Sequence, residues 1–192
     1  MNKNRWLNKK FEVYLDPIYY EEILPPYKFK GKTDEQILEE YLCEQTKKQG
    51  HKFKLTLELG CGSGRGTKVL KKYCEKIIAV DLNQKMLDLA KQRLGKRSNI
   101  DFYCEEMLDF VIKHHNLIKN VDLIVSFWAL NYSLNAEFTY RDPSKKIFKP
   151  KDPNNALQKC MNKLDNLFKG VSDKAKFIIL SEQENYRRLG LR

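Results

Sequence analysis

The sequence predicts an α/β fold in which helices cover both faces of a doubly wound, mostly parallel sheet. Short apolar runs with strand character alternate with segments of helical periodicity through the middle of the chain, an order typical of parallel sheets. A glycine-rich turn, Gly60 to Gly66, follows the first strand-like run, and an acid, Asp81, ends the second. The carboxyl ends of such strands form the ligand-binding edge of a doubly wound sheet. We therefore expect a three-layer αβα architecture with a ligand at this edge.

The elements of the first half follow from local patterns. Residues 1–33 are aromatic and irregular, and we expect them to form an N-terminal lid. Apolar residues at helical spacing predict a helix over 34–48. The apolar run Phe53–Leu59 predicts the first strand of the sheet, and a crossover helix over about 67–73 follows it.

The same alternation continues for two further units. Lys76–Val80 is the second predicted strand. Asn83 can cap the next helix, whose apolar face is Met86, Leu87, Ala90 and Leu94. A short third strand is expected at Ile100–Cys104, a helix at about 107–116 and a fourth strand at 121–127.

A long loop interrupts the pattern at 135–153, where three X-Pro pairs predict extended or turning backbone. A strongly periodic helix is expected over 154–169 and a fifth strand over 175–180. The apolar residues of that helix are expected to face inward: Ala156, Leu157, Cys160, Met161, Leu164, Leu167 and Phe168. Only twelve residues follow the fifth strand, so a shortened C-terminal end with an open sheet edge is predicted.

The length of 192 residues predicts a single domain with a sizeable core. Within it we expect a lid and helix over 1–50 and a ligand-binding core over 51–192. No run approaches the ~20 apolar residues that cross a bilayer, and no apolar run follows the basic amino terminus as in a secretory signal. Five scattered cysteines indicate free thiols in a reducing compartment and no metal site. These features predict no membrane association and a cytoplasmic location, with the nucleus as the alternative.

The most informative segment is Glu58-Leu59-Gly60-Cys61-Gly62-Ser63-Gly64. Glycines at a strand-to-helix junction let the backbone approach a ligand closely. Asp81, at the tip of the next strand, is placed to accept hydrogen bonds from both hydroxyls of a ribose. A dinucleotide fingerprint fits poorly, because Arg65 stands where that pattern needs a small residue, and no Gly-Lys-Ser/Thr of a phosphate loop follows.

The pattern acid-x-Gly-x-Gly-x-Gly, followed by a ribose acid, resembles the first motif of the class I S-adenosylmethionine (SAM)-dependent methyltransferases. The resemblance covers roughly residues 34–180. It implies a Rossmann-like fold, S-adenosyl-L-methionine as cofactor and S-adenosyl-L-homocysteine (SAH) as product. It also implies an enzyme that holds an acceptor in line with the methyl group and catalyses by proximity and orientation.

The resemblance also implies roles for individual residues. Gly60, Cys61, Gly62 and Gly64 would line the methionine part of SAM, and Glu58 would orient its ammonium group. At the second strand, Asp81 would bind the ribose and Leu82 would pack on the adenine. The full predicted cofactor-binding set also includes residues beyond the third and fourth strands: Glu106, Met107 and Ser126.

Two of these assignments keep alternatives. Glu105 competes with Glu106 for the adenine amino group, and both could instead be ordinary acids at a helix N-terminus. Beyond the fourth strand, the segment that contains Trp128, Asn131 and Tyr132 resembles the acceptor region of the family. These three residues would position the acceptor, although Trp128 could also belong to the core and Asn131 could be a turn residue.

The net charge of +11 admits an RNA or other polyanionic partner. Lysine greatly outnumbers arginine, however, and arginine is the residue favoured for bidentate phosphate contacts. We therefore expect a small-molecule acceptor. The alternatives are an RNA methyltransferase, including a cap-type enzyme, and a catalytically silent accessory subunit that binds a partner or RNA. Whether the protein is a monomer or a dimer stays open.

Overall fold

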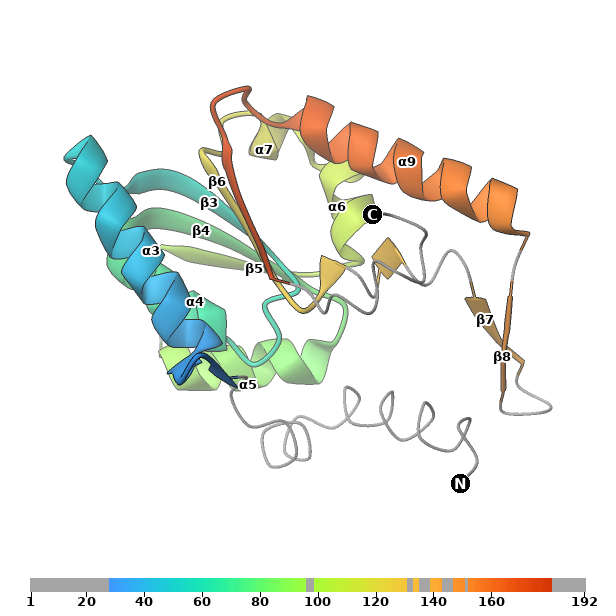
Figure 1. The fold of residues 1–192 in the computed structure, drawn as a ribbon, viewed down its shortest axis with the longest axis horizontal. Coiled ribbons are helices and arrows are strands. Elements are labelled where there is room, and N and C mark those ends of the chain that lie inside the picture. The colour runs from blue at the N-terminus through green and yellow to red at the C-terminus, as the bar shows by residue number, and fades with distance from the viewer. Residues whose placement is uncertain are drawn as a thin grey trace.

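The computed structural model describes residues 28–95, 99–130, 133–134, 139–142, 147–150 and 152–180. At its centre is a five-stranded parallel sheet in the order β5-β4-β3-β6-β9 (Figure 1). Its strands are β3 (Phe53–Leu59), β4 (Cys74–Asp81), β5 (Ile100–Cys104), β6 (Leu123–Phe127) and β9 (Lys176–Leu180). The strand order reverses between β3 and β6, so the carboxyl ends of these two strands frame the crevice where doubly wound sheets bind ligands.

Helices cover both faces of the sheet, as predicted. One face carries α3 (Asp34–Gln49), α4 (Arg65–Tyr73) and α5 (Gln84–Leu94), whose buried side chains form one core cluster with the strands. The other face carries α6 (Met107–Lys113), α7 (His115–Ile118) and α9 (Pro153–Gly170), which contribute to a second cluster. The α/β, doubly wound fold class is therefore confirmed.

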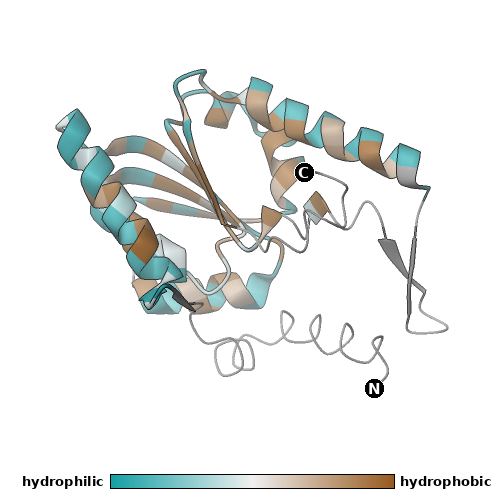
Figure 2. Cartoon of the chain, in the orientation of Figure 1, coloured by the Kyte–Doolittle hydropathy of each residue, from teal (hydrophilic) through white to brown (hydrophobic). Residues whose placement is uncertain are grey.

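Local chemistry explains where the elements on the first face begin and end. Thr33 and Gln36 form a capping box at the start of α3, and Gly50 ends that helix with φ +74°. The Asn83 side chain caps α5 by accepting a hydrogen bond from the backbone of Lys85. Strands β3, β4 and β6 are buried between the two helical layers and are largely apolar (Figure 2).

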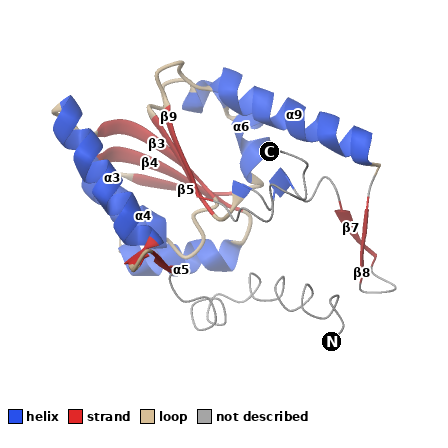
Figure 3. Cartoon of the chain, viewed as in Figure 1, coloured by secondary structure: helices blue, strands red, loops and turns tan. Residues whose placement is uncertain are grey.

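Three sequence predictions about secondary structure need correction (Figure 3). The helix expected at 107–116 is two helices, α6 and α7, which meet at His114. The loop expected at 135–153 contains an antiparallel pair, β7 (Thr139–Asp142) and β8 (Ile147–Pro150). A further short pair, β1 (Lys28–Phe29) and β2 (Lys32–Thr33), precedes α3. The short pairs were missed because their residues show no apolar alternation.

The prediction that all the apolar residues of α9 face inward is also wrong. Ala156, Cys160 and Leu167 are buried, but Leu157, Met161 and Phe168 are 45%, 53% and 53% exposed. A helix that packs on one side buries only one stripe, so an apolar surface wider than that stripe stays partly in solvent. Strand β9 ends the sheet order among the described residues. Residues 1–27 of the predicted lid, which was expected over 1–33, and the chain beyond 180 lie outside them.

No helix in the described part of the chain combines the length and apolarity needed to span a bilayer.

Candidate functional site

The glycine-rich turn links β3 to α4 and is fixed to the neighbouring strand β4. The backbone N–H groups of Gly60 and Cys61 both donate to the Val80 carbonyl, at 2.8 and 3.0 Å. From α5, the Arg93 guanidinium donates to the carbonyl and the hydroxyl of Ser63, each at 2.9 Å. The turn is thus held from two sides, and its backbone is in place before any ligand arrives.

Glycine is required at Gly60 for a steric reason. Its φ is +77°, and a Cβ atom there would lie 2.1 Å from the Cβ of Ala129, just beyond β6. Gly62 also has a positive φ, +52°, but no atom lies within 4 Å of the position a Cβ would take. The turn is therefore tightly packed at its start and open at Gly62.

Asp81 lies against this turn, as the spacing predicted. Its Oδ2 accepts a hydrogen bond from the Gly62 backbone N–H at 2.8 Å, and its Oδ1 accepts one from the Asn83 N–H at 2.9 Å. Burial raises the pKa of Asp81, while these backbone donors oppose the shift. The carboxylate at the tip of β4 is therefore in direct contact with the glycine turn after β3.

Glu58 lies beneath the turn and is 3% exposed. The Thr67 hydroxyl donates to its Oε2 at 2.6 Å, and a Cβ on Gly66 would come within 2.5 Å of its Oε1. Desolvation raises the pKa of Glu58 to about 8, and the nearby Asp81 charge adds to that increase. The carboxyl group is thus mostly protonated at neutral pH when no cation is beside it.

The raised pKa of Glu58 predicts a distinct pH dependence of stability. Because the folded-state pKa, about 8, exceeds the ordinary glutamate pKa of 4.5, the contribution of this group to stability is fully present below pH 4.5 and is lost progressively up to about pH 8. The loss is on the order of 1 kcal/mol per pH unit. We expect Glu58→Gln, which stays neutral, to gain stability relative to the native chain between pH 6 and pH 9 in urea titrations. An equal pH dependence of both proteins would contradict this assignment.

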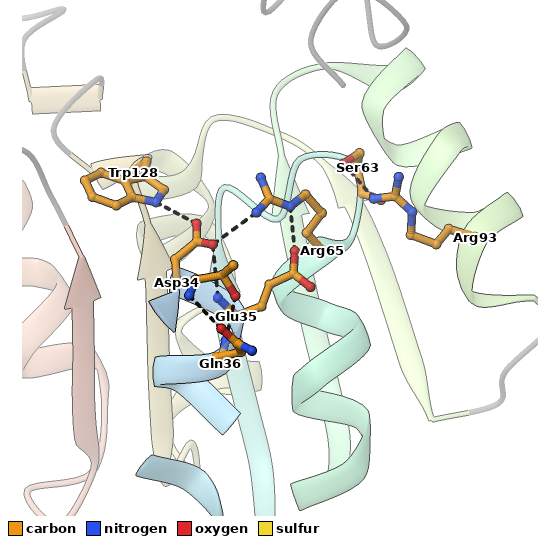
Figure 4. Close-up of polar contacts among 8 residues, drawn as sticks. Asp34, Glu35, Gln36, Ser63, Arg65, Arg93 and Trp128 are labelled. Atoms are coloured by element: carbon orange, nitrogen blue, oxygen red, sulfur yellow. Dashed lines mark hydrogen bonds and ion pairs between the residues drawn. The ribbon is translucent and has the colours of Figure 1, made fainter. Parts of the chain in front are cut away.

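A pocket opens above the turn, and its far wall comes from α3 and the end of β6. The residues that line it are Asp34, Glu35, Glu58, Gly60, Cys61, Gly62, Ser63, Arg65, Gly66, Phe127 and Trp128. The Arg65 side chain lies between two acids of α3, donating to Asp34 at 3.0 Å and to Glu35 at 2.7 Å (Figure 4). Arg65 pairs with both Asp34 and Glu35, and Glu58 is mostly protonated, so the lining carries one more acidic charge than basic charge.

Asp34, Glu35 and Arg65 were missed as pocket residues by sequence reasoning. Asp34 was expected only to begin a helix, and Arg65 was considered only as an obstacle to a dinucleotide motif. Their approach to the turn depends on how α3 packs against α4, and no local pattern encodes it. Among the residues predicted to bind an acceptor, Trp128 does line the pocket, whereas Asn131 and Tyr132 lie outside the described residues.

The remaining predicted residues lie at three different places. Met107 reaches the turn, since its Cε would lie 3.3 Å from a Cβ on Gly60. Leu82, beyond the tip of β4, is 71% exposed. The buried Ser126 hydroxyl donates to the Leu59 carbonyl and accepts from the Leu130 N–H, so it joins β3 to the chain after β6.

The carboxyl group of Glu106 is occupied in capping α6. Its Oε2 accepts hydrogen bonds from the Leu108 and Asp109 backbone, at 2.9 and 2.8 Å, and its Oε1 accepts one from the Ser133 hydroxyl. Glu105 pairs with Lys113 and His114, both at 3.0 Å. Glu106 thus takes the helix N-terminal role that the sequence left open, whereas Glu105 precedes the helix and pairs with residues at its end.

Comparison with known proteins decides the family. The family described as "Methyltransferase domain" matches residues 57–164, more than half of the chain and including both the glycine turn and Asp81. This chain belongs to the methyltransferase-domain family. The class I, SAM-dependent assignment made from the motif is thereby confirmed, and so is SAM as the family's cofactor.

A curated relative of this methyltransferase domain is malonyl-[acyl-carrier protein] O-methyltransferase 1 of Ilyobacter polytropus. It is 33% identical over 94 residues, which are 48% of this chain and 30% of that protein. The match therefore spans less than a third of the relative's length.

Solved structures share the fold of the methyltransferase domain. The N-methyltransferase NodS from Bradyrhizobium japonicum WM9 aligns with a TM-score of 0.55 and 20% identity, covering 82% of this chain and 74% of NodS. The DhpI–SAM–HEP complex aligns with a TM-score of 0.55 and 13% identity, covering 99% of this chain and 72% of that one. At these identities the likeness concerns the fold. Neither the RNA alternative nor the accessory-subunit alternative gains support from the matches.

Proposed function

We propose that this protein transfers a methyl group from SAM to a small-molecule acceptor, and that the glycine turn and Asp81 hold the cofactor. The observation that carries the proposal is the hydrogen bond from the Gly62 N–H to the Asp81 carboxylate. It joins the two predicted parts of the cofactor motif: Asp81 contacts the glycine turn, and the turn lines the pocket. The family match supports the reaction class.

The residues present fit the chemistry of SAM at three points. Gly62 has open space where a side chain would otherwise lie, so the turn can receive the methionine end. Asp81 has lone pairs left after accepting two backbone hydrogen bonds, and these can receive ribose hydroxyls. Leu82 offers an exposed apolar surface beyond the tip of β4, which suits a flat adenine ring.

Charge supplies a further reason. SAM carries a sulfonium, an ammonium and a carboxylate group and is cationic overall. The pocket contributes Asp34 and Glu35 against the guanidinium of Arg65, together with the carboxyl group of Glu58. An ammonium group beside Glu58 would favour its ionised form and lower its raised pKa. We therefore assign Glu58 to the orientation of the ammonium group.

The bound cofactor supplies an electrophilic methyl group on sulfur. The protein's own residues would bind and orient the two reactants and exclude water, and no nucleophilic side chain is needed. Phe127 is the last residue of β6 and Trp128 follows it, and both line the pocket. We propose that Trp128, with Asn131 and Tyr132, forms the side of the site that meets the acceptor.

The acceptor is proposed to be a small molecule. The relative from Ilyobacter polytropus is, by its name, an O-methyltransferase acting on malonyl-[acyl-carrier protein], and NodS is named an N-methyltransferase. A malonyl thioester is therefore the first acceptor to test, followed by amines. Labelled SAM incubated with metabolite pools would identify the acceptor class by its mass shift.

Titration calorimetry with SAH tests the proposed function before the acceptor is known. We expect saturable binding with a Kd of about 10–100 μM, within the range of common substrate affinities. Circular dichroism on the same sample would establish that the protein is folded. An absence of heat from a folded sample up to millimolar SAH would contradict the proposal.

A further inference from the structure

Asp34, the first residue of α3, is buried against α4 and the chain beyond β6, and both oxygens of its carboxylate accept hydrogen bonds. It is 5% exposed although it is the first residue of an α-helix. Its Oδ2 accepts a hydrogen bond from the Trp128 indole Nε1 at 3.0 Å. Its Oδ1 accepts two more, from the Arg65 guanidinium and the Glu35 backbone, each at 3.0 Å. One carboxylate thus joins three segments that are far apart in the sequence.

Trp128 is held in a backbone conformation that tryptophan rarely adopts. Its φ is +58°, in the left-handed region, and its backbone N–H donates to the Leu180 carbonyl at 2.9 Å. Such a conformation costs roughly 1 kcal/mol or more and persists where the surroundings over-determine it. The hydrogen bond from the indole to Asp34 is one such constraint (Figure 4).

We propose that Asp34 is a positioning residue of the cofactor pocket, which fixes the indole of Trp128 and the guanidinium of Arg65 as its outer wall. The proposal rests on the proposed function, because it concerns the same pocket. All three side chains line that pocket. Arg65 begins α4 directly after Gly64, whereas Asp34 comes from α3 and Trp128 from the chain after β6. Asp34 acts through Trp128. Without the carboxylate, the indole loses its hydrogen-bond acceptor, and its orientation in the pocket is no longer fixed.

A comparison within the same helix pair separates this role from simple helix packing. Glu39 of α3 pairs with Lys72 of α4 at 2.7 Å, but this pair is exposed and does not line the pocket. Asp34 is the partner of the half-buried indole of Trp128 at the pocket wall, whereas Glu39 only links the two helices. Glu39→Ala is therefore a matched control for the removal of an α3 carboxylate.

The contact can be tested without any ligand. The chain has two tryptophans, Trp6 and Trp128, so Trp6→Phe leaves Trp128 as the single reporter. In this background we expect Asp34→Ala to shift the Trp128 emission to longer wavelength and to increase its quenching by acrylamide. Glu39→Ala should leave both unchanged. Unchanged emission and quenching in the Asp34 variant would overturn the proposed contact.

The role in binding is tested by a double-mutant cycle with SAH as the probe. Asp34→Ala and Trp128→Phe should each weaken SAH binding by about 10-fold, the effect of one lost charge-assisted hydrogen bond. Because both variants remove the same interaction, the double variant should also lose about 10-fold. Multiplied losses of about 100-fold would show that Asp34 does not act through the indole and would overturn the inference.

Two further outcomes separate the inference from the proposed function. If the native chain binds no SAH while folded, the proposed function fails, and the inference built on it fails with it. If the native chain binds SAH and Asp34→Ala binds equally tightly, the function stands and the inference alone is overturned. Thermal unfolding of each variant would establish that the fold is retained, with Glu39→Ala as the reference.

Discussion

Gly60→Ala is expected to destabilise the protein by about 3 kcal/mol and to abolish measurable SAH binding. Two free-energy costs add at this position, a steric clash and a strained backbone conformation. The new Cβ would lie 2.1 Å from the Cβ of Ala129, and the residue would have to keep a φ of +77°. The glycine turn or the chain after β6 must then move, and either movement disturbs the pocket. Urea unfolding and SAH calorimetry on the same preparation would measure both effects.

Gly50→Ala is the matched control for the backbone conformation alone. Gly50 also has a positive φ, +74°, but nothing lies within 4 Å of its added Cβ, and it ends α3 away from the pocket. We expect a loss of stability of about 1 kcal/mol and unchanged SAH affinity. If Gly60→Ala lowered the free energy of unfolding no more than Gly50→Ala does, the close approach of the turn to Ala129 would not contribute to stability.

Asp81→Ala is expected to lower SAH affinity by about 100-fold or more, since it removes a charged partner of the ribose hydroxyls. It also leaves the backbone N–H groups of Gly62 and Asn83 without their carboxylate acceptor. The fold should therefore lose about 2 kcal/mol as well. Calorimetry with SAH, together with urea unfolding, would separate the two losses.

The chain offers a control that shares the structural part of this role. Asp122 accepts hydrogen bonds from the Lys54 and Leu55 backbone, at 2.8 and 3.1 Å, before the start of β6 and so at the opposite end of the sheet. Asp122→Ala should cost a similar amount of stability and leave SAH affinity unchanged. Equal effects of the two variants on SAH affinity would mean that Asp81 only supports the turn.

The parts of this protein that sequence reasoning predicted are those encoded by neighbouring residues. The parallel strands appear as short apolar runs, because both of their faces are buried. The glycine turn and Asp81 were found together because the βαβ unit fixes their spacing, and the structure joins them through the Gly62 N–H. Asn83 was expected as a cap and is one.

The parts that escaped prediction depend on packing between distant segments. The contact between Asp34 and Trp128 spans 94 residues and depends on where α3 lies on the sheet. Glu106 caps α6 in the structure, which is one of the two roles that the sequence left open for it, because a motif comparison could not separate a cap from an adenine contact. The exposure of Leu157 and Met161 followed from how much of α9 is covered, which apolar periodicity does not specify.

A crystal structure of the protein with SAH would test most directly whether the turn after β3 and the carboxylate at the tip of β4 bind the cofactor. We predict the ribose hydroxyls within hydrogen-bond distance of Asp81, and the homocysteine end over Gly60 to Gly64 with its amino group toward Glu58. SAH bound elsewhere, or a pocket left empty at saturating SAH, would contradict the assignment of this pocket as a methyl-donor site.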